Sequence, residues 1–216
     1  MVKIILIQHC QSEHHINNMS GGWTDTPLTE LGRSQANLIG LKLKEELNPM
    51  DYIIYSSDLK RAWQTAEIVG NHLNLNILKK KGLREINTGI AAGKTKDWAK
   101  THRNPHKGHF FELNYQEFQE GETRREFYVR VYSCMEEIIT NSKEKDLMII
   151  THGGTLGYII AWWLKFEEKM LINTYFSASP ASISILHNEN YYRQQTLSVF
   201  NDKSHLYKLN KTHHLF

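Results

Sequence analysis

The stretch Ile4-Ile5-Leu6-Ile7-Gln8-His9-Cys10-Gln11-Ser12 decides the fold of this chain. A short, wholly apolar run rich in β-branched residues stops abruptly at a polar segment that carries an imidazole. This pattern is typical of a buried parallel strand that delivers side chains to the C-terminal edge of a sheet. Ligands of open α/β sheets bind at that edge. The sequence therefore predicts an α/β fold and makes His9 a candidate site residue.

Further strands and helices continue the α/β pattern along the chain. Buried strands are predicted at 51–55 and 147–151, a short one at 77–78, and a hairpin of 181–186 with 192–199 at the edge of the sheet. Apolar residues three and four apart predict helices from Thr29, from Ser56 and around Phe127, and Thr155 to Leu164 reads as a buried helix. Residues 83–86 are predicted as a strand exit. The chain shows no internal repeat and no linker, so one domain spanning 1–216 is expected.

Composition limits the classes of function. The 216-residue chain is 40% hydrophobic and 23% charged, as in ordinary soluble globular proteins. Its apolar runs are too short for a signal-peptide core or a membrane span, which predicts a cytoplasmic protein without membrane contact. Cys10 and Cys134 lie far apart and predict no disulfide framework. A net charge of +3 suits anionic small molecules and is too small for a nucleic-acid footprint, so no nucleic-acid partner is expected.

Three other positions carry chemistry that complements His9. Arg61 lies in the first turn of a predicted helix, where free backbone N–H groups already favour anions. His152 follows the strand at 147–151, and Glu85 precedes a turn. A neutral imidazole can attack phosphorus, cationic and neutral donors can spread over the equatorial oxygens, and a carboxylic acid can protonate the leaving oxygen. The set predicts phosphoryl transfer without a metal or another cofactor.

The motifs around these positions resemble those of a known family. They are Pro27-Leu28-Thr29-Glu30-Leu31-Gly32-Arg33, Tyr55-Ser56-Ser57-Asp58-Leu59-Lys60-Arg61-Ala62, Leu83-Arg84-Glu85, Gly121-Glu122-Thr123 and Thr151-His152-Gly153-Gly154. Together they resemble the histidine phosphatase superfamily, which includes cofactor-dependent phosphoglycerate mutases. The resemblance implies a three-layer α/β/α sandwich with a mostly parallel sheet. It also implies His9 as the phosphorylated nucleophile, Arg61 and His152 as phosphate ligands, and Glu85 as the proton donor.

The opening motif departs from the family pattern. The family has Arg-His-Gly, then threonine two residues later and asparagine three after that, whereas this chain has Gln8-His9-Cys10 with Ser12 and His15. Glutamine removes a bidentate cation from the phosphate pocket. A protonated His15 would restore part of the charge, with a titration near pH 6–7 that favours activity in acid. The substrate-binding residues implied are Gln8, Ser12, His15, Gly22, Arg61 and Gly153.

The segment from about 90 to 122 is predicted to be a lid insertion. It lacks clear periodicity and carries His102, His106 and His109 among aromatic and basic side chains. Long irregular segments within compact domains are often functional, and a solvated excursion is the alternative. The aromatic and basic character of 98–115 suits a fairly large or partly apolar phosphate ester.

The function predicted is a metal-independent phosphatase that hydrolyses small phosphomonoesters through a phosphohistidine on His9. A family member that only binds phosphorylated ligands is an alternative, and a phosphoglycerate mutase is a further one. A cysteine nucleophile at Cys10 would need an arginine at position 16, where this chain has Ile16. A zinc hydrolase using His9, His14, His15 and His152 is disfavoured, because adjacent residues of an extended segment point to opposite faces. The expected partner is a small phosphorylated substrate, and a homodimer stays open.

Overall fold

A six-stranded mixed sheet forms the centre of the computed structural model, which describes residues 2–106, 108, 111–142 and 145–207. The strand order is β3-β2-β4-β1-β5-β6, in which β1, β2, β3 and β4 are parallel and β5 and β6 run antiparallel. The strands are β1 Lys3–Gln8, β2 Tyr52–Ser56, β3 Ile77–Lys79, β4 Asp146–Thr151, β5 Ile183–His187 and β6 Thr196–Asp202. The mostly parallel sheet is therefore confirmed.

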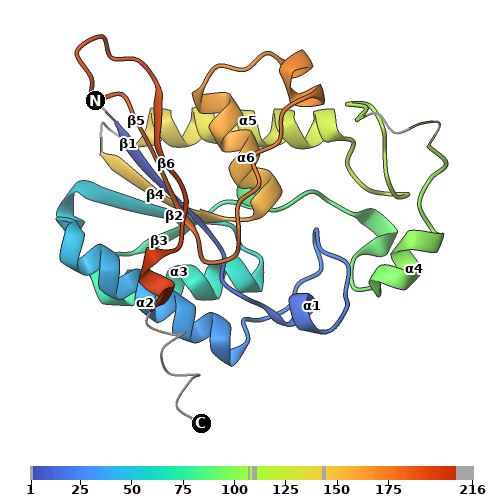
Figure 1. The fold of residues 1–216 in the computed structure, drawn as a ribbon, viewed down its shortest axis with the longest axis horizontal. Helices are drawn as coiled ribbons and strands as arrows, with labels where there is room; N and C mark the ends of the chain where they lie inside the picture. The colour runs from blue at the N-terminus through green and yellow to red at the C-terminus, as the bar shows by residue number, and fades with distance from the viewer. Residues whose placement is uncertain (1, 107, 109–110, 143–144, 208–216) are drawn as a thin grey trace.

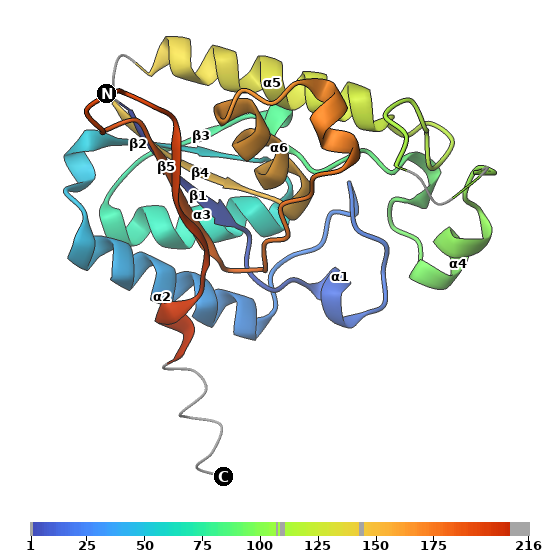
Figure 2. The ribbon, with the colours of Figure 1, turned by 45° about the horizontal axis from the view of Figure 1, so that its top comes forward.

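Helices cover both faces of the sheet (Figures 1 and 2). Because side chains alternate along a strand, Ile4 and Leu6 of β1 face one layer while Ile5 and Ile7 face the other. The first pair packs with α5 and α6, and the second with α2 and α3. These helices are α2 Glu30–Glu46, α3 Lys60–Leu73, α5 Arg124–Asn141 and α6 Gly153–Trp163. The three-layer α/β/α sandwich is confirmed.

The register of the sheet places the two motif histidines side by side. Gln8 at the end of β1 pairs with Thr151 at the end of β4, so His9 and His152 leave the sheet together. β2 lies on the other side of β4 and ends at Ser56, which leads into α3 and Arg61. The carboxyl ends of three neighbouring strands thus supply the polar residues that the sequence singled out.

Two local predictions need correction. The helix after β2 begins at Lys60 without a side-chain cap, because the Ser57 hydroxyl lies 2.8 Å from His152 Nε2 instead. Residues 83–86 lead away from β3, as predicted for a strand exit, and the Thr151 hydroxyl donates to the Leu83 carbonyl at 2.7 Å. The second hairpin strand starts at Thr196, because the Asn190 side chain accepts from the Gln194 N–H and closes a longer turn. A short helix, α1 Glu13–Ile16, was not predicted.

The predicted lid lies to one side of the sheet and contains a short helix, α4 Lys96–Thr101 (Figure 1). Ala91, Ala99 and Phe118 pack into a small apolar cluster of their own. His102 stacks on Trp98 with ring centroids 3.8 Å apart, and the third histidine of the segment, His109, lies outside the described residues. Within the described ranges, no helix is long and apolar enough to cross a membrane.

Candidate active site

His9 follows β1 and is buried, with its ring held in one tautomer. Its Nδ1 lies 2.8 Å from the carbonyl oxygen of Cys10, so Nδ1–H donates to that oxygen. Nε2 accepts a hydrogen bond from Arg61 Nε at 3.1 Å and therefore presents its lone pair. Burial, and next the positive charge of Arg61, lower the pKa of His9 well below its usual value. The imidazole is thus neutral, with its lone pair on Nε2.

Arg61 connects His9 to the loop that follows α1. Its side chain is 1% exposed and donates to the carbonyl oxygens of Thr24 and Gly22 at 2.6 and 2.7 Å. Burial lowers the pKa of Arg61 to about 10, which leaves it a cation at neutral pH. Gly22 has a φ of 60°, and a Cβ there would lie 2.4 Å from a side-chain carbon of Thr88. Only glycine allows this close approach.

His152 and Gln8 bring buried polar atoms without partners to the same edge of the sheet. His152 Nε2 lies 2.8 Å from the Ser57 hydroxyl, and its ring centroid is 5.0 Å from that of His9. Neither His152 Nδ1 nor the Gln8 amide oxygen has a hydrogen-bond partner within the described part of the chain. The Gln8 amide also lies against Gly153, at the start of α6. Unpartnered buried polar atoms are rare, and a helix start favours anions. The Gln8 oxygen is an acceptor, so a phosphate oxygen in this corner would need its donors from the Gln8 NH2 group and His152.

The histidines of α1 pack beside His9 and are neutral. Ser12 N–H donates to His15 Nδ1 at 3.1 Å, and the Ser12 hydroxyl lies 2.8 Å from His14 Nδ1. The His15 ring stacks on that of His9 with centroids 5.5 Å apart. Burial, followed by the charges of Arg61 and Lys96, lowers the pKa of His15. The prediction that His15 supplies positive charge by titrating near pH 6–7 is therefore wrong in direction.

The structure also bears on the two other mechanisms considered, a zinc hydrolase and a cysteine nucleophile. His14 and His15 do not point apart as in an extended segment, because they lie on one helical turn with centroids 4.0 Å apart. Even so, the described residues contain no group of three or more His, Cys, Asp or Glu side chains that could hold a metal ion. Burial raises the pKa of the Cys10 thiol to about 12, so it is protonated and a poor nucleophile.

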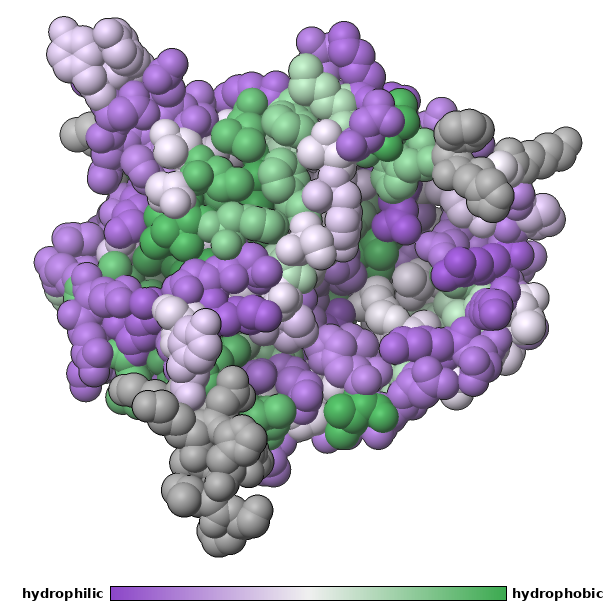
Figure 3. Space-filling view, viewed as in Figure 1, coloured by the Kyte–Doolittle hydropathy of each residue, from purple (hydrophilic) through white to green (hydrophobic). Residues whose placement is uncertain are grey.

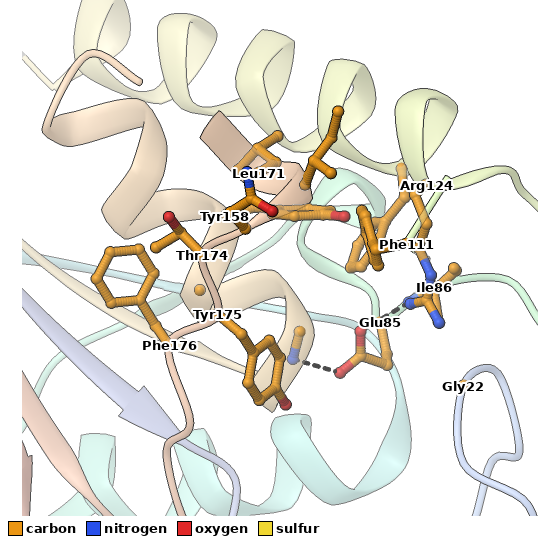
Figure 4. Close-up of a pocket in the computed structure, with 15 residues that line it drawn as sticks. Gly22, Glu85, Ile86, Phe111, Arg124, Tyr158, Leu171, Thr174, Tyr175 and Phe176 are labelled. Atoms are coloured by element: carbon orange, nitrogen blue, oxygen red, sulfur yellow. Dashed lines mark hydrogen bonds between the residues drawn. The ribbon is translucent and has the colours of Figure 1, made fainter. Parts of the chain in front are cut away.

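Glu85 lies in the loop between the sheet and the predicted lid, at the wall of a pocket (Figure 4). Its carboxylate accepts hydrogen bonds from the backbone N–H groups of Gly154 at 2.8 Å and Ile86 at 2.9 Å. Arg84 is not its partner, because Arg84 forms a bidentate pair with Asp58 at 2.7 and 2.8 Å. The pocket has a volume of about 710 Å³, and Gly22 and Gly154 line it together with Glu85.

A sequence match to the histidine phosphatase superfamily (branch 1) covers residues 4–203. This chain belongs to the histidine phosphatase superfamily. It is 31% identical over 174 residues to a broad-specificity phosphatase of Saccharomyces cerevisiae, covering 78% of this chain and 72% of the relative. Phosphoserine phosphatase 1 of Hydrogenobacter thermophilus is 28% identical over 215 residues, with 95% of each chain covered. Relatives named as phosphoglycerate mutases also match.

The fold of this histidine phosphatase family member also matches solved structures. The YhfR protein of Bacillus stearothermophilus superimposes with a TM-score of 0.77 at 25% identity, covering 95% of this chain and 100% of that protein.

Sequence patterns identified the residues that meet around His9 but missed their supports. Ser57 sits inside a recognised motif, yet its bond to His152 depends on how two strands pair. Arg130 of α5 donates to the backbone carbonyl oxygens of Arg84 and Glu85 and so fixes the Glu85 loop. The pocket wall at 171–176 begins within the 3₁₀ segment Glu168–Ile172 and carries no motif. These contacts are long-range, so no local signal could reveal them.

Five histidines with lowered pKa values should make the folded chain sensitive to acid. They stay neutral in the fold, whereas in the unfolded chain they gain protons below about pH 6.5. The contribution of these neutral histidines to the free energy of unfolding is therefore fully present above about pH 6.5 and is lost as the pH falls. For His14 the loss continues down to about pH 3. Each histidine can contribute up to about 1.4 kcal/mol per pH unit. The five are His9, His14, His15, His152 and His205.

Urea unfolding at pH 8, 6 and 5 measures this effect. We expect the midpoint to fall steadily, and His205→Leu, which removes one of the five imidazoles, to reduce the slope by at most one proton. A midpoint that stays constant between pH 8 and pH 5 would contradict the assignment of neutral buried histidines.

Proposed function

We propose that this chain is a metal-independent phosphatase that hydrolyses small phosphomonoesters through a phosphohistidine at His9. The observation that carries the proposal is the state of the His9 ring: Nδ1–H is bound to the Cys10 carbonyl, and the Nε2 lone pair is directed at the Arg61 guanidinium. A neutral imidazole with its Nδ1–H fixed keeps its lone pair on Nε2, and this lone pair becomes free to attack when a phosphate oxygen takes over the Arg61 N–H. The phosphatases among the relatives support the same reaction class.

The reaction then proceeds in two displacements. His9 Nε2 attacks phosphorus while the bond to the ester oxygen breaks, and the acid form of Glu85 gives its proton to the leaving alcohol. The Glu85 carboxylate next takes a proton from water, whose oxygen attacks the phosphohistidine. The N–P bond breaks, inorganic phosphate leaves, and Nε2 regains its lone pair. Arg61, His152 and the Gly153 N–H at the start of α6 stabilise the charge on the phosphoryl oxygens.

Assay of an aryl phosphate in the presence of a metal chelator tests the reaction class. We expect steady release of inorganic phosphate at neutral pH that added magnesium or zinc does not increase. With a phosphoglycerate as the substrate instead, movement of the phosphoryl group to a second position without release would identify a mutase. Turnover that the chelator abolishes would contradict a metal-independent reaction.

Gln8 favours a second candidate, a domain that binds phosphorylated ligands without turnover, because it stands where the family has arginine. We expect Gln8→Arg to raise kcat/KM for an aryl phosphate roughly tenfold to a hundredfold, since a charge-assisted hydrogen bond replaces a neutral one worth about 1–3 kcal/mol less. Gln8→Met, of similar length and without a donor, should lower it. Binding of vanadate with no turnover in either the wild type or Gln8→Arg would support the binding domain. Lower activity in a folded Gln8→Arg variant would show that glutamine suits the charge balance of the site.

A further inference from the structure

The pocket beside Glu85 brings together segments that are far apart in the chain. Figure 4 shows Glu85 and Gly22 at one end, Tyr158 and Leu171 at the other, and Tyr175 and Phe176 along one side. Phe111 from the predicted lid closes the opposite side. The segment between α6 and β5 forms the outer wall, and hydrophobic residues gather beside it on the face shown in Figure 3. The pocket is therefore walled by several chain segments and extends away from Glu85, the proposed proton donor.

The walls of this pocket are mainly aromatic and aliphatic. Tyr158 packs edge to face against Tyr128 and at a tilt against Phe127, with centroids 5.5 and 4.8 Å apart, which holds its ring in place. Gly157 adds no side chain to the floor of the pocket. A Cβ there would lie in ordinary contact with Phe176, 3.6 Å from its carbonyl oxygen. A benzene molecule fits a cavity of about 150 Å³. The volume of about 710 Å³ therefore has room for a leaving group larger than one ring.

The charged groups that line the pocket are already paired. The Glu85 carboxylate accepts from two backbone N–H groups. Arg124 donates to Glu117 at 3.3 Å, and Glu117 also pairs with Arg103 at 2.9 Å. Arg124 is the one cation among the described lining residues, and a carboxylate on the substrate would compete with Glu117 for its guanidinium. The carboxylate and ammonium of the leaving group of phosphoserine would both lose hydration against the mainly apolar walls.

We propose that this pocket selects phosphomonoesters of aromatic or bulky apolar alcohols over small acidic ones. The inference rests on the proposed function, because Glu85 can protonate only a leaving oxygen next to it, and the alcohol then extends into the pocket that Glu85 lines. Burying an apolar group there gains free energy from water release, and the aromatic walls offer stacking partners. The selected substrate class thus differs from the substrate in the name of the phosphoserine phosphatase relative.

The test compares binding of 1-naphthyl phosphate and O-phosphoserine to the full chain carrying His9→Ala, which keeps the pocket but lacks the proposed nucleophile. Calorimetry should give a dissociation constant for the naphthyl ester at least about a hundredfold lower. In the wild type, kcat/KM should favour the naphthyl ester by a similar factor. Gly157→Leu fills the floor and should reduce the ratio of kcat/KM for 1-naphthyl to ethyl phosphate at least tenfold.

Further variants guard against misfolding and separate the two proposals. Gly157→Ala adds only an ordinary contact within a helix and should lower the same ratio less than leucine does. Val129→Leu on the exposed side of α5 is the matched control and should leave the ratio unchanged. Equal or tighter binding of phosphoserine, or a ratio that neither Gly157 variant changes, would overturn the pocket assignment. No turnover of any ester, with tight naphthyl binding retained, would instead overturn the proposed function alone.

Discussion

His9→Ala should lower kcat for an aryl phosphate by roughly 10⁴- to 10⁶-fold, the scale seen when an enzyme loses its nucleophile. The imidazole supplies the nitrogen that attacks phosphorus in the first displacement. His14 and His15 lie close to His9, but both are engaged by Ser12 through their Nδ1 atoms. Steady-state release of inorganic phosphate measures the loss, with circular dichroism to confirm the fold.

A matched histidine variant provides the control for this experiment. His102→Ala removes an exposed imidazole that stacks on Trp98 in the predicted lid, and activity should stay within about twofold, as for surface changes away from the chemistry. Turnover in a folded His9→Ala variant within tenfold of the wild type would rule out His9 as the nucleophile.

Glu85→Gln should lower kcat about 10²- to 10⁴-fold for an alkyl phosphate and much less for 4-nitrophenyl phosphate. An alkoxide is a poor leaving group and needs a proton, whereas nitrophenolate leaves without one. Glutamine keeps one acceptor oxygen, for the Gly154 N–H, and gives up the hydrogen bond from the Ile86 N–H, so circular dichroism must confirm the fold. A series of substrates with leaving groups of increasing acidity measures the dependence.

The control is Glu137→Gln, which removes an exposed carboxylate that pairs with Lys80 on the outer side of α5. We expect no change in the dependence on the leaving group. An equal loss for alkyl and nitrophenyl esters in Glu85→Gln would show that Glu85 positions the substrate and does not protonate the leaving oxygen.

Sequence patterns predicted the site residues that directly follow the ends of strands. An apolar run that stops at a polar residue marks the edge of a sheet, and the pairing of Gln8 with Thr151 then brings His9 and His152 together. The helix-start position of Arg61 was also visible, although its burial was not. Burial follows from the loop carbonyls of Gly22 and Thr24, which close over the guanidinium.

The features that escaped prediction depend on contacts between distant segments. α1 is a single turn of four residues, too short to show a helical period. Ser57 carries the chemistry of a helix cap, but its hydroxyl bonds to His152, 95 residues away. The aromatic pocket combines the predicted lid, α6 and the segment at 171–176, and none of these alone marks a binding site.

Rapid mixing of excess enzyme with ³²P-labelled aryl phosphate, followed by an alkaline quench, tests most directly whether His9 carries the phosphoryl group. We predict a labelled protein whose phosphate is stable in alkali and lost in acid, located by mass spectrometry at His9 and absent from His9→Ala. Turnover by the wild type with no labelled protein, or with label on another residue, would contradict the account.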